Sequence, residues 1–181
     1  MRLRKNKIRL LLLFISVLIF SQTTYSQTAT KKENIMAAYI YNFIKFFEWP
    51  DSNKGNDLII SVIGKSDIAE SLSSLAEKTT LPGRNIIVKE ISNMAQLGKT
   101  SVLFIATKSE KTLREIKYNL PMNGLLTLSY AKGFAEKGVG INFIDMGDKI
   151  KFEINRKVLE TNGIATGSRI LALAAKIYDS Y

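Results

Sequence analysis

Four short runs of apolar and β-branched residues, separated by stretches with helical spacing, constrain the fold of this chain more than any other feature. The runs are Leu58–Ile63, Ile86–Ile91, Val102–Ala106 and Leu125–Ser129. The first and third are almost continuously apolar, as strands buried on both faces of a parallel sheet are. The second carries Lys89 and Glu90, so we expect it to be an outer strand. Strands that alternate with helices predict an α/β domain with a mostly parallel sheet.

The stretch from 34 to 47 repeats apolar residues at spacings of one, three and four, as a helix with a wide apolar face does. Its aromatic residues fit core packing, except Tyr41, which falls among polar positions. Tyr41 is therefore the one aromatic side chain here that we expect to be exposed and available to a partner. Pro50 ends the helix, because the residue before a proline is driven out of the helical region. Ser66 and Asp67 are candidate caps of a further helix.

Beyond residue 139 the pattern changes to that of a hairpin. Residues 140–144 and 149–155 flank a turn at 146–148, and the second arm alternates strictly between apolar and polar residues. We expect Glu153 and Asn155 on its exposed face, with capping of the next helix as the alternative role of Asn155. Two helices, 155–161 and 167–179, close the chain, the second with Arg169 on its outer side.

Together these patterns predict one fold class. It is an α/β three-layer sandwich with a mostly parallel central sheet of about six strands, a C-terminal antiparallel hairpin and helices on both faces. No repeat, low-complexity tract or linker divides the sequence, so a single domain is expected.

The N-terminus has the three parts of a secretory signal peptide. Five basic residues within the first nine precede the apolar run from Leu10 to Phe20, and small polar residues follow. A spanning helix needs about 20 apolar residues, so a retained membrane anchor is the weaker interpretation. We predict a signal peptide at 1–26 with cleavage after Ser26, a mature domain at 27–181 and a periplasmic location. Without cysteine, the mature chain has no site for a lipid anchor.

The high formal charge does not indicate a nucleic-acid partner. Of the 26 basic residues, five lie in the predicted signal, which leaves 21 against 16 acidic ones and a charge of +5. The remaining lysines are scattered, whereas nucleic-acid binding calls for a basic cluster.

Residues suited to catalysis or metal binding are scarce. With no histidine and no cysteine, the usual zinc ligands and nucleophile–base pairs are missing, and stability must come from packing rather than disulfides. We expect no enzyme, no metal and no cofactor. An enzyme would need two carboxylates, or a serine and a lysine, brought together in a deep pocket.

One segment resembles the end of a phosphate-binding loop. Gly64, Lys65 and Ser66 follow a predicted buried strand and open a helix, where backbone N–H groups can hold an anion. The first glycine of that motif would stand at position 59, which is Ile59. A plain turn with a capped helix is the alternative.

Several segments resemble, in the same order, the YfiR-like periplasmic proteins. They are Met36–Pro50, Pro82–Arg84, Val102–Ile105, Gly133–Ala135, Ile141–Phe143, Phe152–Asn155, Gly163–Ile164 and Ser168–Ala174. There are departures. Val139 separates two glycines that are adjacent in many relatives, Gly167 stands where a second serine is usual, and the disulfides of some relatives are impossible here.

The resemblance implies a non-catalytic regulator. Such a protein binds the periplasmic part of an inner-membrane signalling protein, for instance a diguanylate cyclase, and represses it. Glu153, Asn155 and Arg169 are the partner-binding candidates that the resemblance implies, and Tyr41 is added from its expected exposure. The sequence leaves room for a homodimer. The alternative function is a periplasmic sensor of small molecules, with Gly64, Lys65 and Ser66 as its candidate site.

Overall fold

The computed structural model describes residues 24–53, 55–121 and 123–180. Two compact units are distinguished, 1–32 and 33–181, and helix α2 (Thr24–Phe46) runs across their boundary. The following description concerns the second unit; the predicted signal peptide lies almost wholly outside the described residues. Within the described part of the chain, no helix has the length and apolar character of a membrane-spanning segment.

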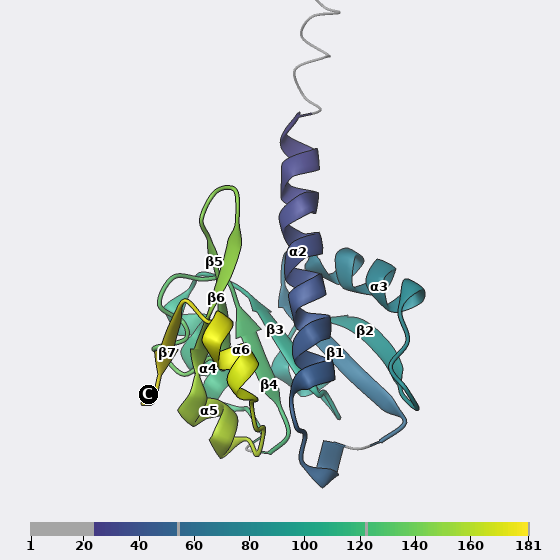
Figure 1. Ribbon diagram of the computed structural model, residues 1–181, viewed down its shortest axis with the longest axis vertical. Helices are drawn as coiled ribbons and strands as arrows, with labels where there is room; N and C mark the ends of the chain where they lie inside the picture. The colour runs from purple at the N-terminus through teal and green to yellow at the C-terminus, as the bar shows by residue number, and fades with distance from the viewer. Residues whose placement is uncertain (1–23, 54, 122, 181) are drawn as a thin grey trace, which may run out of the picture. The chain divides into compact units, whose positions relative to one another are not determined.

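Seven strands form one sheet, in the order β2-β1-β3-β4-β5-β6-β7 (Figure 1). All neighbouring strands are parallel except β5 and β6, which form the antiparallel hairpin. The strands are β1 (Asp57–Gly64), β2 (Asn85–Ile91), β3 (Val102–Ala106), β4 (Leu126–Ser129), β5 (Ile141–Asp145), β6 (Ile150–Asn155) and β7 (Lys176–Tyr178). The predicted fold class is confirmed, and β2 lies at an edge as expected.

Helices cover both faces of this sheet. The helices after α2 are α3 (Ile68–Lys78), α4 (Glu110–Tyr118), α5 (Arg156–Thr161) and α6 (Ser168–Leu173). On one face, Phe43 of α2 stacks on Phe143 with 6.3 Å between ring centroids and meets Phe152 edge-on at 5.0 Å. On the other face, Leu113 and Ile116 of α4 join a separate core cluster with residues of β3. This arrangement is the three-layer sandwich that the sequence predicts.

Helix α2 packs on the sheet through one apolar face. Its buried residues recur at helical spacing and form a stripe that faces the sheet. They are Met36, Ala37, Ile40, Phe43 and Ile44, with Phe47 just beyond the helix.

The prediction of one helix over 167–179 is wrong. Helix α6 ends at Leu173, Ala174 takes an extended conformation, and the N–H of Ala175 donates to the carbonyl of Phe152. Residues 176–178 then form β7 beside β6. Ile177, an apolar residue of this segment, is 39% exposed. No glycine or proline marks this break, so the apolar spacing alone favoured a longer helix.

Candidate functional site

An apolar groove lies on the surface between the C-terminal end of α2 and helix α6. It has a volume of about 450 Å³. Its lining residues are Phe46, Gly167, Ser168, Arg169, Ile170 and Leu173.

Backbone pairing brings these two segments together. The N–H of Glu48 donates to the carbonyl of Ala165, and the N–H of Ala165 donates back, each at 3.0 Å. The indole N–H of Trp49 donates to the carbonyl of Ile44 at 3.0 Å and so fixes the chain as it leaves α2. Helix α6 follows directly and is held by Ile170, whose side chain is buried in the main core.

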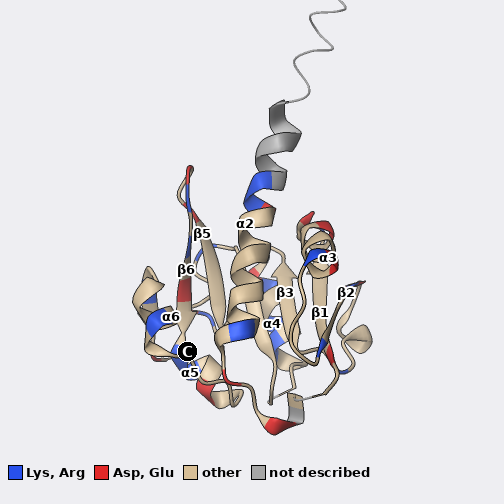
Figure 2. Cartoon of the chain, turned by 45° about the vertical axis from the view of Figure 1, so that its right-hand side comes forward, with Lys and Arg blue, Asp and Glu red and all other residues tan. Residues whose placement is uncertain are grey.

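The groove combines exposed apolar side chains with positive charge. Phe46 is 54% exposed and Leu173 is 66% exposed. The ammonium group of Lys45 lies 5.4 Å from the centre of the Phe46 ring, and Arg169 is exposed on α6. Figure 2 shows a basic segment on each of the two helices. The groove therefore suits an apolar segment that carries acidic residues beside it.

The predicted partner residues do not form one site. Arg169 lines the groove, on the face of the sheet covered by α2. Glu153 belongs to the other face, because it alternates along β6 with the buried Phe152 and Ile154. Its carboxylate is half-buried and accepts hydrogen bonds from the Asn142 amide at 3.2 Å and the Tyr178 hydroxyl at 3.3 Å. The partner-binding roles of Arg169 and Glu153 stay predictions.

The expectation that Asn155 is exposed is wrong, since its side chain is fully buried. Its amide group donates to the carbonyls of Ala135 at 2.8 Å and Ser180 at 3.0 Å. Its side-chain oxygen accepts from the N–H of Val158 at 3.1 Å, which confirms the alternative role as the cap of α5. The β6 alternation places this residue on the polar face, but α5 and the C-terminal segment cover it there.

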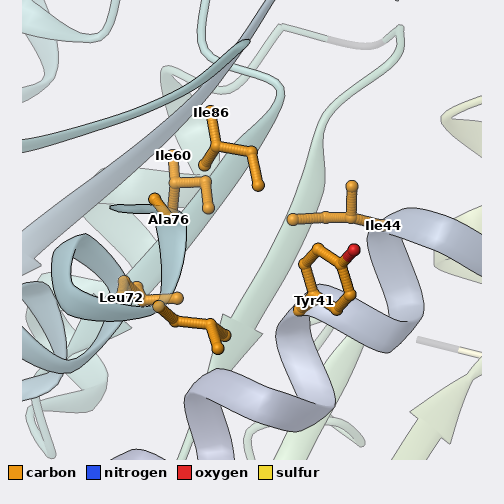
Figure 3. A pocket seen from close by; sticks show the side chains of 7 residues that line it. Tyr41, Ile44, Ile60, Leu72, Ala76 and Ile86 are labelled. Atoms are coloured by element: carbon orange, nitrogen blue, oxygen red, sulfur yellow. The ribbon is translucent and has the colours of Figure 1, made fainter. Parts of the chain in front are cut away.

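The expectation that Tyr41 is exposed is also wrong. Tyr41 is half-buried, and its hydroxyl donates to the carbonyl of Thr80 at 3.1 Å. With six apolar side chains it lines a small pocket between α2, α3 and the sheet (Figure 3). The pocket volume is about 10 Å³, which is room for about one water molecule and too little for a metabolite.

The segment Gly64–Ser66 has the geometry of a turn followed by a capped helix. Gly64 has φ +100°, and a Cβ atom there would collide with the carbonyl oxygen of Ala106, so only glycine fits. The Ser66 hydroxyl accepts from the N–H of Ile68 at 3.3 Å, at the start of α3. The expected capping by Asp67 is wrong, because its side chain makes no capping hydrogen bond although it is the N-cap residue. The role of Gly64, Lys65 and Ser66 as an anion site stays a prediction.

A second surface depression lies along α4. Its volume is about 340 Å³, and Leu113, Arg114 and Lys117 line it together with the ion pair of Glu110 and Lys137. The hydrogen bond from Lys137 lowers the pKa of Glu110, so this carboxylate stays ionised within the basic depression. The Glu110 carboxylate neutralises part of the positive charge of Arg114 and Lys137, which weakens the attraction of the depression for an anion.

Sequence reasoning missed two residues of the groove. The expectation that Phe46 packs in the core is wrong: its side chain is 54% exposed, because it lies to one side of the apolar stripe of α2. Leu173 gave no such signal, because its exposure depends on where α6 ends.

Comparison with protein families shows which family the chain belongs to. The family model DUF4154, described as YfiR/HmsC-like, matches residues 33–175. The chain belongs to the YfiR/HmsC-like family. The match covers almost all of the α/β unit, and it includes both sides of the groove. No curated protein sequence matches the chain.

Two solved structures are similar to part of this chain, and the first of them shares its fold. One is the ABC domain from Streptococcus pneumonia in complex with L-Trp, with a TM-score of 0.50, 13% identity, and coverage of 66% of this chain and 55% of that one. The other is a conserved domain protein from Vibrio cholerae O1 biovar eltor, with a TM-score of 0.47, 15% identity, and coverage of 78% and 60%. The YfiR/HmsC-like chain aligns with little more than half the length of either protein. The first match, at 13% identity, bears on the fold alone.

Proposed function

We propose that this YfiR/HmsC-like protein is an exported, non-catalytic regulator that binds a membrane-bound signalling protein and represses it. A diguanylate cyclase, or a similar sensor, is the proposed partner, and its periplasmic part is what the regulator contacts. The proposal includes removal of residues 1–26 and a periplasmic location for the remaining chain. Membership of the family over residues 33–175 supports it.

The observation that carries the proposal is the groove between α2 and α6. Large exposed apolar side chains gathered in one hollow mark protein-binding sites on soluble proteins. Phe46 and Leu173 are such side chains, and Lys45 and Arg169 add positive charge beside them. The matching partner surface is an apolar segment of the membrane protein with acidic residues next to it.

A regulator of this kind needs no reactive side chain. It acts when it binds one conformational state of its partner more tightly than another, which shifts the population toward the favoured state. A shift from mostly active to mostly inactive partner requires a difference in affinity of about 10⁴-fold between the two states. Burial of a few large apolar side chains, with electrostatic complementarity, is a realistic source of part of that difference.

The test uses a deletion strain complemented with variants. Deletion is expected to raise the cellular level of cyclic-di-GMP. Complementation with the wild-type gene is expected to return it to the original low level. Leu173→Glu places a negative charge in the groove, so it is expected to fail in complementation while the protein level stays normal. The matched control is Tyr118→Glu, which changes a side chain that is 91% exposed on α4 and should complement fully.

Cross-linking in cells identifies the partner. A photo-crosslinking residue at position 173 is expected to capture an inner-membrane protein, and the same residue at 118 is not. Unchanged cyclic-di-GMP after deletion, together with no membrane protein captured from position 173, would contradict the proposal. If both of those results are negative and a metabolite stabilises the purified protein in a thermal-shift screen, the small-molecule sensor is favoured instead.

A further inference from the structure

The groove between α2 and α6 is too open to enclose a small molecule. Sites for small molecules bury most of the ligand surface between their walls. Here the walls themselves are exposed to solvent, since Phe46 is 54% exposed and Leu173 is 66% exposed. An occupant that covers both side chains must therefore be larger than a metabolite, as a segment of another protein is.

The walls of the groove offer side chains and not a strand edge. Both walls are helices, whose backbone N–H and C=O groups bond within the helix. Where the two segments meet, Glu48 and Ala165 bind each other through their own N–H and C=O groups. An extended segment in this groove would leave its backbone groups without partners against apolar side chains, which is unfavourable. A helix satisfies its backbone internally, so a helical segment fits the groove better.

One positive charge stands on each wall (Figure 2). On α2, the ammonium group of Lys45 lies 5.4 Å from the centre of the ring of Phe46, which lines the groove. On α6, the exposed Arg169 lines the groove itself. Neither of the two basic side chains forms an ion pair with a residue that the structure describes. Both charges are therefore available to a partner.

The same charges argue against a second copy of the chain as the occupant. The residues that line the groove include Arg169 and no acidic side chain. Two grooves brought face to face across a two-fold axis would gather two copies of each positive side chain in one contact. Like charges across an interface disfavour it, whereas acidic residues on a different protein favour it.

We propose that the occupant of this groove is an amphipathic helix of the membrane partner. Its apolar residues lie at i, i+3 or i+4, and i+7, and cover Phe46 and Leu173. An acidic residue lies on each side of that apolar stripe, one beside Lys45 and the other beside Arg169. The inference rests on the proposed function, and it adds the conformation of the partner segment and the arrangement of its charges.

Cross-linking at residue level tests the helix. A photo-crosslinking residue replaces Phe46, or Leu173, in the full-length protein in cells, and the captured partner residues are mapped by mass spectrometry. Both positions are expected to capture one partner segment, at residues separated by three, four or seven places. Captured residues separated by two would indicate an extended segment, and capture of a second copy of this chain would indicate a homodimer. Either result would overturn the proposal.

Charge reversal tests the two sides of the stripe. Lys45→Glu and Arg169→Glu are each expected to lower the yield of the cross-link from position 173 several-fold. The matched control is Lys111→Glu, which reverses a side chain that is 82% exposed on α4 and should leave the yield unchanged. Changing the partner's acidic residue on one side to lysine is expected to restore the yield in Lys45→Glu only, and changing the one on the other side in Arg169→Glu only.

The possible failures can be told apart. Unchanged yields in both reversed variants, or restoration of both by the same partner residue, would overturn the arrangement of charges while a captured membrane protein still supports the proposed function. If neither position 46 nor position 173 captures a membrane protein and deletion leaves cyclic-di-GMP unchanged, the proposed function fails and the helix proposal fails with it.

Discussion

Strands β7 and β2 form the two edges of the same sheet, but different interactions hold them. β7 has only three residues, and side chains of neighbouring elements bind the chain around it. Asn155 donates to the carbonyl of Ser180, Tyr178 donates to Glu153, and Arg156 pairs with Asp179. β2 has seven residues, and its side-chain hydrogen bonds join it to loops and to β1: Arg84 binds the preceding loop, Asn85 binds Asp57, and Lys89 binds the carbonyls of Gln96 and Leu97.

The comparison shows two ways for a sheet to end. At β7 the last residues are bound back onto β6 and α5, so a partner strand would have to displace them. At β2 the tethers reach the preceding loop through Arg84 and the following loop through Lys89, and among the described strands β2 pairs with β1 alone. The variants below test each half of this contrast, from the largest expected effect to the smallest.

Asn155→Ala is expected to be the most destabilising of these changes. It removes the cap of α5 and leaves the buried carbonyl of Ala135 and that of Ser180 without their donor. We expect a loss of about 3 kcal/mol in the free energy of unfolding, measured by urea denaturation. Hydrogen exchange should speed up at β6 and β7 while β1 and β2 stay protected.

Asn162→Ala is the matched control, because Asn162 ends the same helix and contributes backbone N–H bonds there. Its expected cost is below about 0.5 kcal/mol. Equal losses in the two variants would mean that the buried side chain of Asn155 does not hold this end of the sheet.

Arg84→Ala tests the opposite edge. The Arg84 guanidinium donates to the carbonyls of Gly55 at 3.0 Å and Asn53 at 2.7 Å, and partial burial lowers its pKa without removing its charge. Because the group is partly exposed, we expect a loss of about 1–2 kcal/mol in unfolding free energy. Faster hydrogen exchange is expected at the start of β1 and β2 and not at β7.

The control for this change is Arg114→Ala. The Arg114 side chain is 72% exposed and lies 4.0 Å from Glu110, so its removal should leave stability nearly unchanged. If both arginine variants unfold at the wild-type midpoint, the tether at the β2 edge is unimportant.

The sequence predicted more of the β2 half than of the β7 half, for a physical reason. Strands β1 and β3 are almost continuously apolar, as strands buried on both faces of a parallel sheet are, and the charged residues of β2 indicate an edge strand. At the C-terminal end, residues 170–178 keep an apolar spacing that suits a helix, and the hydrogen bond from Ala175 to Phe152 decides otherwise. Such a tertiary contact leaves no local signal.

The same distinction holds for the candidate site. The capping role of Asn155 could be predicted from the sequence, because an asparagine just before a helix is a common cap. The burial of Asn155 could not be predicted, because Ala135 and Ser180 are distant in sequence and contact it only in the folded protein. The exposure of Phe46 and Leu173 in one groove also depends on tertiary structure, since the pairing of Glu48 with Ala165 brings the two segments together.

Tyr178→Phe should have a smaller effect than the Asn155 change. It removes the hydroxyl that donates to the Glu153 carboxylate at 3.3 Å and keeps the ring. We expect a loss of about 0.5–1 kcal/mol in unfolding free energy, since both groups remain partly solvated. The paired control is Tyr118→Phe, where a 91% exposed side chain should give no change. If neither variant changes the free energy of unfolding, the contact between Tyr178 and Glu153 does not stabilise the β7 edge.

Asp179→Asn should have the smallest effect. The Asp179 carboxylate accepts from the Arg156 guanidinium at 2.7 Å and raises the pKa of that arginine, but both side chains are about half exposed. Exposed ion pairs contribute little, so the unfolding midpoint should fall less than in Tyr178→Phe. The difference from wild type should also disappear in 1 M salt, where the screening length is about 3 Å. Asp148→Asn in the exposed hairpin turn is the control. A loss as large as that of Asn155→Ala, unchanged by salt, would mean that the ion pair and not the buried amide closes this edge.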